Sequence, residues 1–378
     1  MRRKLALFLT ILLLLTFFAG CEKQEADPGL GNGWEPVREM PLQYARQFQV
    51  LYYEGGYKLL SVRNGGRFLL IPEGKEAPGG IAGDIVPLYG PMDHIYLVAT
   101  SAMCLFDALD RLDSIRLSGT KQEGWYIDGA REAMERGDIL YAGKYSEPDY
   151  EKILSEGCKL AIESTMIGHA SEVKDKLESL HIPVLVDHSS MESHPLGRTE
   201  WIKFYGALLD EEEKAEELFN QQKAYLDAVD GLEPTGKTVV FFHISSSGFV
   251  VTRKSGDYVS KMIQLAGGTY AFSDLGDPEK STSTVTIEME TFYQTAKEAD
   301  YVIYNSTIGG EIPDLETFLS LNEVLKNFKA VKNGNVWCTG QNMFQQTMEL
   351  GQMIGDFHEM LTSEDPELTK LNYLYKLQ

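Results

Sequence analysis

The stretch DEEEKAEELFNQQKAYLDAVD, residues 210–230, decides how the chain divides. Asp210 followed by Glu213 is a capping-box arrangement, and glutamates in a first turn favour the positive end of a helix dipole. Apolar residues then recur at spacings of three and four, and Gly231 with Pro234 ends the pattern. The stretch therefore predicts a helix of about 20 residues, roughly 30 Å long.

On both sides of this helix the sequence alternates between strand and helix patterns, and 378 residues exceed the size at which one hydrophobic core keeps growing. We interpret residues 210–231 as a connecting helix between an N-terminal lobe at 42–209 and a C-terminal lobe at 232–362. Residues 363–378 follow as a C-terminal tail. The predicted fold is α/β, with two lobes built on mostly parallel sheets and a ligand cleft between them. A surface helix inside one large domain is the alternative.

The N-terminus has the pattern of an exported lipoprotein. Arg2, Arg3 and Lys4 precede an apolar run that ends at Phe18, and a small-residue pair leads into Cys21. This resembles a secretory leader at 1–20 with the lipobox of bacterial lipoproteins, although Phe18 stands where that box prefers Leu. The resemblance implies lipid on Cys21 and attachment to the outer face of the cell membrane. An uncleaved signal anchor is the alternative.

Residues 21–41 are rich in charge, Gly and Pro, which predicts a flexible linker. Alternating apolar residues at 48–62 then predict a hairpin, and 67–72 a third strand, so residues 42–89 form a β-rich elaboration. The hypothesis is that it pairs with the sheet of the first lobe. The net charge of -21 repels nucleic acid and anionic lipid, so we expect neither as a direct partner.

The order of elements resembles the solute-binding lipoproteins of ABC importers, in the class for iron-siderophore complexes, haem and cobalamin. The resemblance rests on Cys21 and on three segments, IPVLVD at 182–187, EEEKAEELF at 211–219 and VTIEMETFYQTAKEADYVIY at 285–304. It covers roughly residues 90–362. It implies capture of a metal chelate between the lobes, delivery to ABC permease subunits, no permanently bound cofactor and a monomer.

A metal chelate presents flat apolar edges and anionic oxygens, so its site should combine aromatic walls with Arg or Tyr donors. Candidates at strand ends of the first lobe are Ser101, Trp125, Tyr126, Tyr145, Met166, Glu192 and Arg198. Those of the second lobe are Arg253, Tyr258, Asn305, Gln341, Met343 and Phe344. Arg198 and Arg253 would clamp an anionic ligand from both sides. Alternatively, Arg198 pairs with Glu192 or Glu200.

Two other functions stay open. Asp187, His188, Glu192 and His194 follow a predicted strand and could bind bare zinc or manganese. A surface hydrolase or adhesion lipoprotein could share the architecture, but no GxSxG, Walker, HExxH or Rossmann pattern is present, so we expect no enzyme.

The resemblance also implies an acidic residue near the start of a surface helix in each lobe, which docks on the permease. Glu151 and Glu290 occupy comparable places, each before a predicted strand that ends in Ser-Thr. Glu147 and Glu288 are near enough to serve instead. A carboxylate at a helix start is also favoured by the dipole alone.

Overall fold

The computed structural model describes residues 29–30, 33–278, 280 and 283–378. The expected leader, Cys21 and the linker residues up to 28 lie outside the described residues. Within the described ranges no helix is both long and apolar enough to cross a bilayer.

The first lobe is built on a five-stranded sheet in the order β12-β11-β6-β7-β8, all parallel. Its strands are β6 (Ile95–Leu97), β7 (Ile115–Ser118), β8 (Leu140–Tyr141), β11 (Leu160–Ser164) and β12 (Val184–Asp187). Its helices are α2 (Thr100–Ala108), α3 (Asp128–Arg136), α4 (Tyr150–Ser155) and α5 (Ser171–Ser179), with a small hairpin of β9 (Gly143–Lys144) and β10 (Glu147–Pro148). Because the strands are parallel, their carboxyl ends meet along one edge.

The second lobe holds a mixed sheet in the order β16-β14-β13-β17-β18-β19, with β15 beside β13. Its strands are β13 (Thr238–Ile244), β14 (Val250–Arg253), β15 (Thr269–Tyr270), β16 (Thr284–Ile287), β17 (Tyr301–Tyr304), β18 (Val336–Thr339) and β19 (Leu374–Lys376). Its helices are α8 (Tyr258–Leu265), α9 (Met289–Ala296), α10 (Ser306–Gly309), α11 (Leu315–Ser320) and α12 (Lys329–Lys332). The expected tail at 363–378 thus supplies an edge strand, because β19 pairs with β18.

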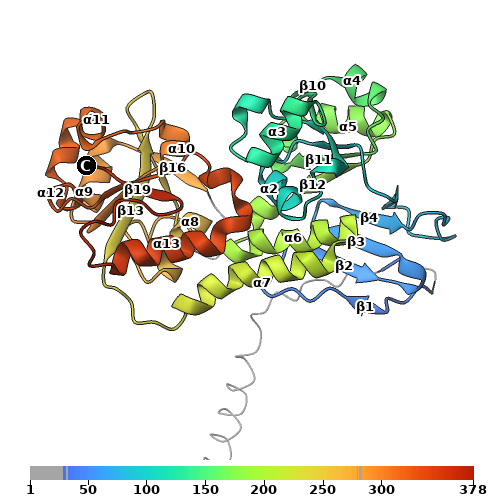
Figure 1. The fold of residues 1–378 in the computed structure, drawn as a ribbon, viewed down its shortest axis with the longest axis horizontal. Helices are drawn as coiled ribbons and strands as arrows, with labels where there is room; N and C mark the ends of the chain where they lie inside the picture. The colour runs from blue at the N-terminus through green and yellow to red at the C-terminus, as the bar shows by residue number, and fades with distance from the viewer. Residues whose placement is uncertain (1–28, 31–32, 279, 281–282) are drawn as a thin grey trace, which may run out of the picture.

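The β-rich elaboration forms a sheet of its own, in the order β1-β2-β3-β4-β5, rather than pairing with the sheet of the first lobe. Its strands are β1 (Arg38–Glu39), β2 (Phe48–Tyr52), β3 (Lys58–Val62), β4 (Gly66–Ile71) and β5 (Ile85–Tyr89). The hairpin predicted at 48–62 is confirmed by the antiparallel β2–β3 pair. Figure 1 shows this sheet beside α6, on the opposite side of the helix from the second lobe.

A layer of helices connects the lobes (Figure 1). It consists of α6 (Pro195–Leu209), α7 (Glu212–Val229) and α13 (Leu350–Thr362), with α7 packed on both of the others. The predicted helix at 210–230 is confirmed, but its predicted cap is wrong. Asp210 ends α6 in the left-handed conformation (φ 59°), and Glu211 precedes α7 without a side-chain cap.

The acidic start of α7 is stabilised by lysines as well as by its dipole. Lys58 of β3 lies 2.6 Å from Glu212, and Lys203 of α6 lies 2.8 Å from Glu216. Both ammonium groups are nearly buried, so the ion pairs fix α7 against α6 and against the N-terminal sheet.

Candidate functional site

Exposed apolar side chains follow the carboxyl ends of strands in both lobes. Tyr126, Met166 and Met191 come after β7, β11 and β12 of the first lobe, and are 43%, 45% and 46% exposed. Phe249 and Ile308 come after β13 and β17 of the second lobe, and are 37% and 59% exposed. Large exposed apolar groups gathered at strand ends are typical of a binding surface. Tyr126 and Met166 were among the predicted residues, whereas the other three were missed because nothing in their local sequence marks them as exposed.

Arg198 lies in the first turn of α6 and faces the second lobe. The helix begins there because Pro195 occupies its first position and His194 Nδ1 accepts the Leu196 N–H at 3.1 Å. The Arg198 guanidinium lies over the ring of Tyr258 in α8, 3.9 Å from its centre, and its Nη2 donates to the Ser190 carbonyl at 2.8 Å. Its Nε is buried and has no hydrogen-bond partner in the described part of the chain.

Arg253 ends β14 on the other side of this contact. Its Nη1 lies 3.4 Å from Asp257 Oδ2, and its guanidinium carbon lies 4.9 Å from the centre of the Phe344 ring. The other oxygen of Asp257 caps α8 by accepting the Val259 N–H at 2.9 Å. Burial raises the pKa of Asp257, while the Arg253 and Arg198 charges act in the opposite direction.

The two arginines are therefore near one another. Burial lowers the pKa of the Arg198 guanidinium, and the charge of Arg253 contributes to that shift. Guanidinium groups stay protonated in proteins nevertheless. Of the predicted residues, the structure brings Arg198, Arg253, Tyr258 and Phe344 together, and we call these four the arginine cluster.

Hydrogen bonds also join the lobes beside the arginine cluster. Gln345 Nε2 donates to the Gly124 carbonyl at 2.7 Å, and its Oε1 accepts the Tyr126 N–H at 2.8 Å. Thr199 Oγ1 donates to the Thr347 carbonyl at 2.9 Å. Gln345 and Thr199 were not predicted, because a bond between residues more than a hundred positions apart leaves no local signal.

Three other predicted residues of the first lobe have neighbours outside the arginine cluster. Trp125 is buried, and its Nε1 donates to Ser118 Oγ at 3.2 Å. Tyr145 is half-buried in the turn between β9 and β10. Ser101 Oγ lies 3.4 Å from the Ser189 hydroxyl.

Three predicted residues of the second lobe lie after β17 and β18. Asn305 is buried, and its Oδ1 has no hydrogen-bond partner within the described ranges. Gln341 lies at 3.4 Å from Glu311, and Met343 is buried. Of these, Asn305 offers an acceptor for a ligand.

The bare-metal alternative is wrong, because Asp187 and Glu192 are each bonded to other groups and the four residues form no cluster that could hold a metal ion. Asp187 accepts from Ser189 N and Tyr205 OH, while Glu192 accepts from Arg46 N, Gln47 N and Trp201 Nε1. Burial lowers the pKa of His188, and it lowers that of His194 to about 4. No group of three or more His, Cys, Asp or Glu that could hold a metal ion occurs among the described residues. Glu192, buried and bonded to backbone, is also not placed to contact a ligand.

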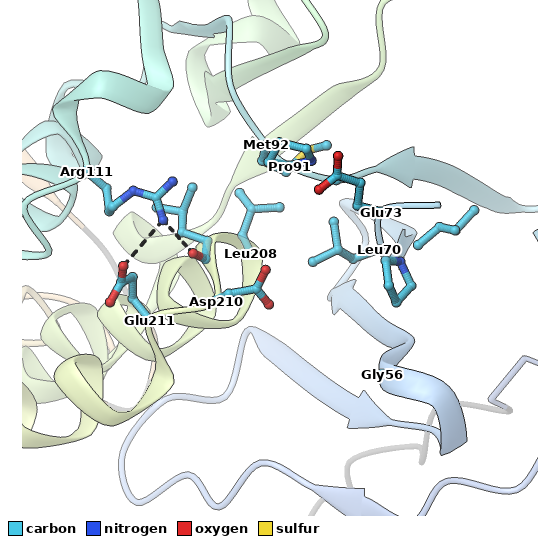
Figure 2. Close-up of a pocket in the computed structure, with 13 residues that line it drawn as sticks. Gly56, Leu70, Glu73, Pro91, Met92, Arg111, Leu208, Asp210 and Glu211 are labelled. Carbon is cyan, nitrogen blue, oxygen red and sulfur yellow. Dashed lines mark hydrogen bonds and ion pairs between the residues drawn. The ribbon is translucent and has the colours of Figure 1, made fainter. Parts of the chain in front are cut away.

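A separate cavity of about 330 Å³ lies at the far end of α6, between the N-terminal sheet and the turn from α6 to α7 (Figure 2). Leu70, Met92 and Leu208 form apolar walls, and Glu73 and Asp210 lie at its edge. Arg111 donates to the Leu209 carbonyl at 2.6 Å there. No residue of the arginine cluster lines this cavity.

The candidate docking glutamates are exposed on short surface helices or just beside them. Glu151 lies in the first turn of α4 in the first lobe, and Glu290 in the first turn of α9 in the second. Glu147 pairs with Lys144 at 3.3 Å, and Glu288 precedes α9. All four carboxylates are thus accessible to a partner.

A model of the family described as "Periplasmic binding protein" matches residues 114–343. An uncharacterized lipoprotein of Methanocaldococcus jannaschii is similar, with 24% identity over 100% of this chain and 97% of its own length. The structure is similar to a periplasmic haem-binding protein of Vibrio cholerae, with 17% identity, a TM-score of 0.58, and coverage of 70% of this chain and 98% of that one. It is also similar to a protein of the ABC-type Fe3+-hydroxamate transport system of Saccharomonospora viridis, with 19% identity, a TM-score of 0.55, and coverage of 72% and 94%. The N-terminal sheet lies before the matched residues of the family model.

Proposed function

Because the chain belongs to the periplasmic binding protein family, we propose that it captures an anionic metal chelate between its two lobes and delivers it to the permease of an ABC importer. The chelate would be a ferric siderophore complex, haem or a corrinoid. The similar solved structures include proteins described as binding haem and as transporting Fe3+-hydroxamate, which supports this class of ligand.

The observation that carries the proposal is the arginine cluster. Two guanidinium groups from opposite sides of the lobe junction lie near one another. The carboxylate in direct contact with this pair is Asp257, which lies beside Arg253. The buried Nε of Arg198 still has a hydrogen to donate. An anionic oxygen would accept this hydrogen and balance the charge, since charge-assisted hydrogen bonds are the strong ones. Exposed aromatic and methionine side chains at the strand ends would cover the apolar faces of the chelate.

The remaining alternatives lack this support. The family is one of binding proteins, so the hydrolase interpretation is wrong. The adhesion interpretation accounts for neither the paired arginines nor the exposed strand ends. We also propose a lipid anchor on Cys21, which the description of the similar archaeal chain as a lipoprotein supports.

The test is the absorption spectrum of the protein purified from its native membranes, together with its metal content. Ferric chelates, haem and corrinoids have separate visible bands, so one of these spectra is expected at up to one ligand per chain. A colourless protein that carries stoichiometric zinc or manganese would overturn the proposal.

A further inference from the structure

The N-terminal sheet is attached to α6 through two buried carboxylates. Glu200, fully buried, accepts the N–H groups of Gln43, Tyr44 and Ala45 at 2.7 to 3.1 Å. Glu192, 1% exposed, accepts those of Arg46 and Gln47 at 2.9 to 3.0 Å. Five successive backbone donors, residues 43–47, are thus bonded to two side chains. We call this segment the strap.

The strap lies on the same turns of α6 that carry Arg198. Glu192 precedes the helix, and Glu200 follows Arg198 by two positions, so at about 100° per residue it projects from nearly the opposite side. The strap also passes close to Gly197, the neighbour of Arg198, because a Cβ there would lie 3.2 Å from the Tyr44 carbonyl oxygen. The Tyr44 ring also stacks on His194, which caps the helix, with 4.3 Å between ring centres.

Aromatic packing continues the attachment along α6. The Phe48 ring lies 5.0 Å from that of Trp201 and 5.4 Å from that of Phe204. Every residue of α6 is buried except Arg198, which is half-buried. At the far end of the helix, beside the cavity of Figure 2, Lys58 of β3 donates to the Ala207 carbonyl at 2.9 Å. The sheet is therefore attached at both ends of α6, and the strap is the attachment at the end that carries Arg198.

We propose that the N-terminal sheet is a working part of the ligand site, in which Glu192 and Glu200 are positioning residues that hold the strap against α6 and thereby keep Arg198 directed at the second lobe. The expected effect on ligand binding rests on the proposed function, because it requires that Arg198 contacts the ligand. The effect of the strap on the orientation of Arg198 does not depend on any ligand. The sheet lies before the residues that the family model matches.

Glu200 holds the strap through its two acceptor oxygens, one of which also pairs with the buried Lys203 at 3.2 Å. A carboxylate offers enough acceptor sites for several N–H donors, whereas an amide replaces one oxygen with a group that is itself a donor. Glu200→Gln would place an amide donor where Oε1 now accepts the Gln43 N–H at 2.9 Å and pairs with Lys203 at 3.2 Å. A donor would then face two donors in a buried place, which is costly. The strap would then move away from the first turns of α6, and Arg198 would lose its fixed orientation.

The first test is ligand-free and uses the full chain. Crystal structures and amide hydrogen exchange are compared for the parent protein, Glu200→Gln and the milder Gly197→Ala, in which the new methyl group presses on Tyr44. We expect faster exchange at 43–47 and displacement of the Arg198 guanidinium from the Tyr258 ring. Glu216→Gln is the matched control, because Glu216 is the other carboxylate partner of Lys203 and does not touch the strap. An Arg198 that stays on Tyr258 while the strap is loosened overturns the proposal.

The second test asks whether the effect on binding passes through Arg198. With haemin and ferric citrate as probes, Glu200→Gln should weaken binding about tenfold in the parent protein, the size of one charge-assisted hydrogen bond. It should have no further effect in the Arg198→Ala background. An equal loss in both backgrounds contradicts positioning. If neither probe binds the parent protein, the failure concerns these ligands, and the ligand-free structures still decide the role of the strap.

Discussion

The guanidinium carbon of Arg198 lies 3.9 Å from the centre of the Tyr258 ring, which joins the start of α6 to the start of α8. A cation over an aromatic ring contributes about 0.5 to 2 kcal/mol, depending on burial. The contact thus holds Arg198 at the lobe junction without using its buried Nε–H. The arginine is oriented beforehand, so a ligand would not have to order it, and preorganisation of this kind favours affinity.

Replacement of the paired arginines should weaken chelate binding from both sides. We expect Arg198→Gln and Arg253→Gln each to lower affinity about tenfold or more, because each removes charge-assisted hydrogen bonds. Titration calorimetry with the ligand recovered from native membranes measures this. Arg136→Gln, an exposed arginine at the end of α3, is the control and should bind normally. Unchanged affinity in both single variants would show that the two-sided clamp is wrong.

Loss of the Gln345 side chain should loosen the lobe junction. Gln345→Ala removes two hydrogen bonds to the first lobe, at Gly124 and Tyr126, each contributing about 1 kcal/mol. The Tyr126 amide should then exchange its hydrogen faster in the ligand-free protein. Gln341→Ala is a matched control because that side chain bonds within the second lobe, to Glu311. Equal exchange rates in the two variants would show that Gln345 does not stabilise the lobe junction.

Glu163 should make the stability of the first lobe depend on pH. The residue is fully buried in β11, and neither carboxylate oxygen has a hydrogen-bond partner in the described ranges, so burial raises its pKa to about 8. Tyr96 and Tyr150 are the titratable groups it influences. The folded protein keeps this proton while the unfolded chain releases it, so the free energy of unfolding falls as pH rises from about 4.5 to about 8.

Glu163→Gln removes that dependence. The variant should match the parent protein near pH 4 and exceed it above pH 8 by up to about 5 kcal/mol, since one pKa unit corresponds to about 1.4 kcal/mol. Urea unfolding at several pH values measures the difference. Glu172→Gln, an exposed carboxylate in α5 of the same lobe, should show no such trend. A constant difference at all pH values would mean that Glu163 is ionised in the folded state.

Cys21 is predicted to carry lipid, because the basic start, the apolar run and the small-small-Cys sequence coincide there. Labelled fatty acid should enter the parent protein but not Cys21→Ser, and the variant should leave the membrane fraction. Incorporation of labelled fatty acid into the variant would contradict the lipoprotein prediction.

Glu151 and Glu290 are predicted to dock on the permease. The double replacement by Gln should leave folding and ligand binding intact but abolish uptake, and the association rate of the parent protein should fall as salt is added. If the two residues only stabilise their helices, stability would fall by a few tenths of a kcal/mol and uptake would continue. Normal uptake at normal protein levels would show that these two glutamates do not dock on the permease, and Glu147 and Glu288 would be tested next.

The sequence was sufficient for many of the strands and helices. Alternating apolar residues predict the β2–β3 hairpin, and the short apolar runs at 160–164 and 301–304 predict the buried strands β11 and β17. Such patterns are local, because side chains return to the same face every two residues in a strand and every 3.6 residues in a helix. They could not reveal α6, whose residues are buried on all sides except at Arg198 and therefore show no polar face.

The partners of individual polar side chains were decided by the tertiary structure. The sequence proposed Arg198 and Arg253 as a pair, and only the fold placed one over Tyr258 and the other beside Asp257. Glu192 and His194, proposed as metal ligands, are bonded to the strap and to the start of α6 instead. The physical reason is distance along the chain. Strand and helix patterns are fixed by neighbours a few residues away, whereas the charge, burial and hydrogen bonds of a side chain depend on segments such as 43–47 that lie about 150 positions from it.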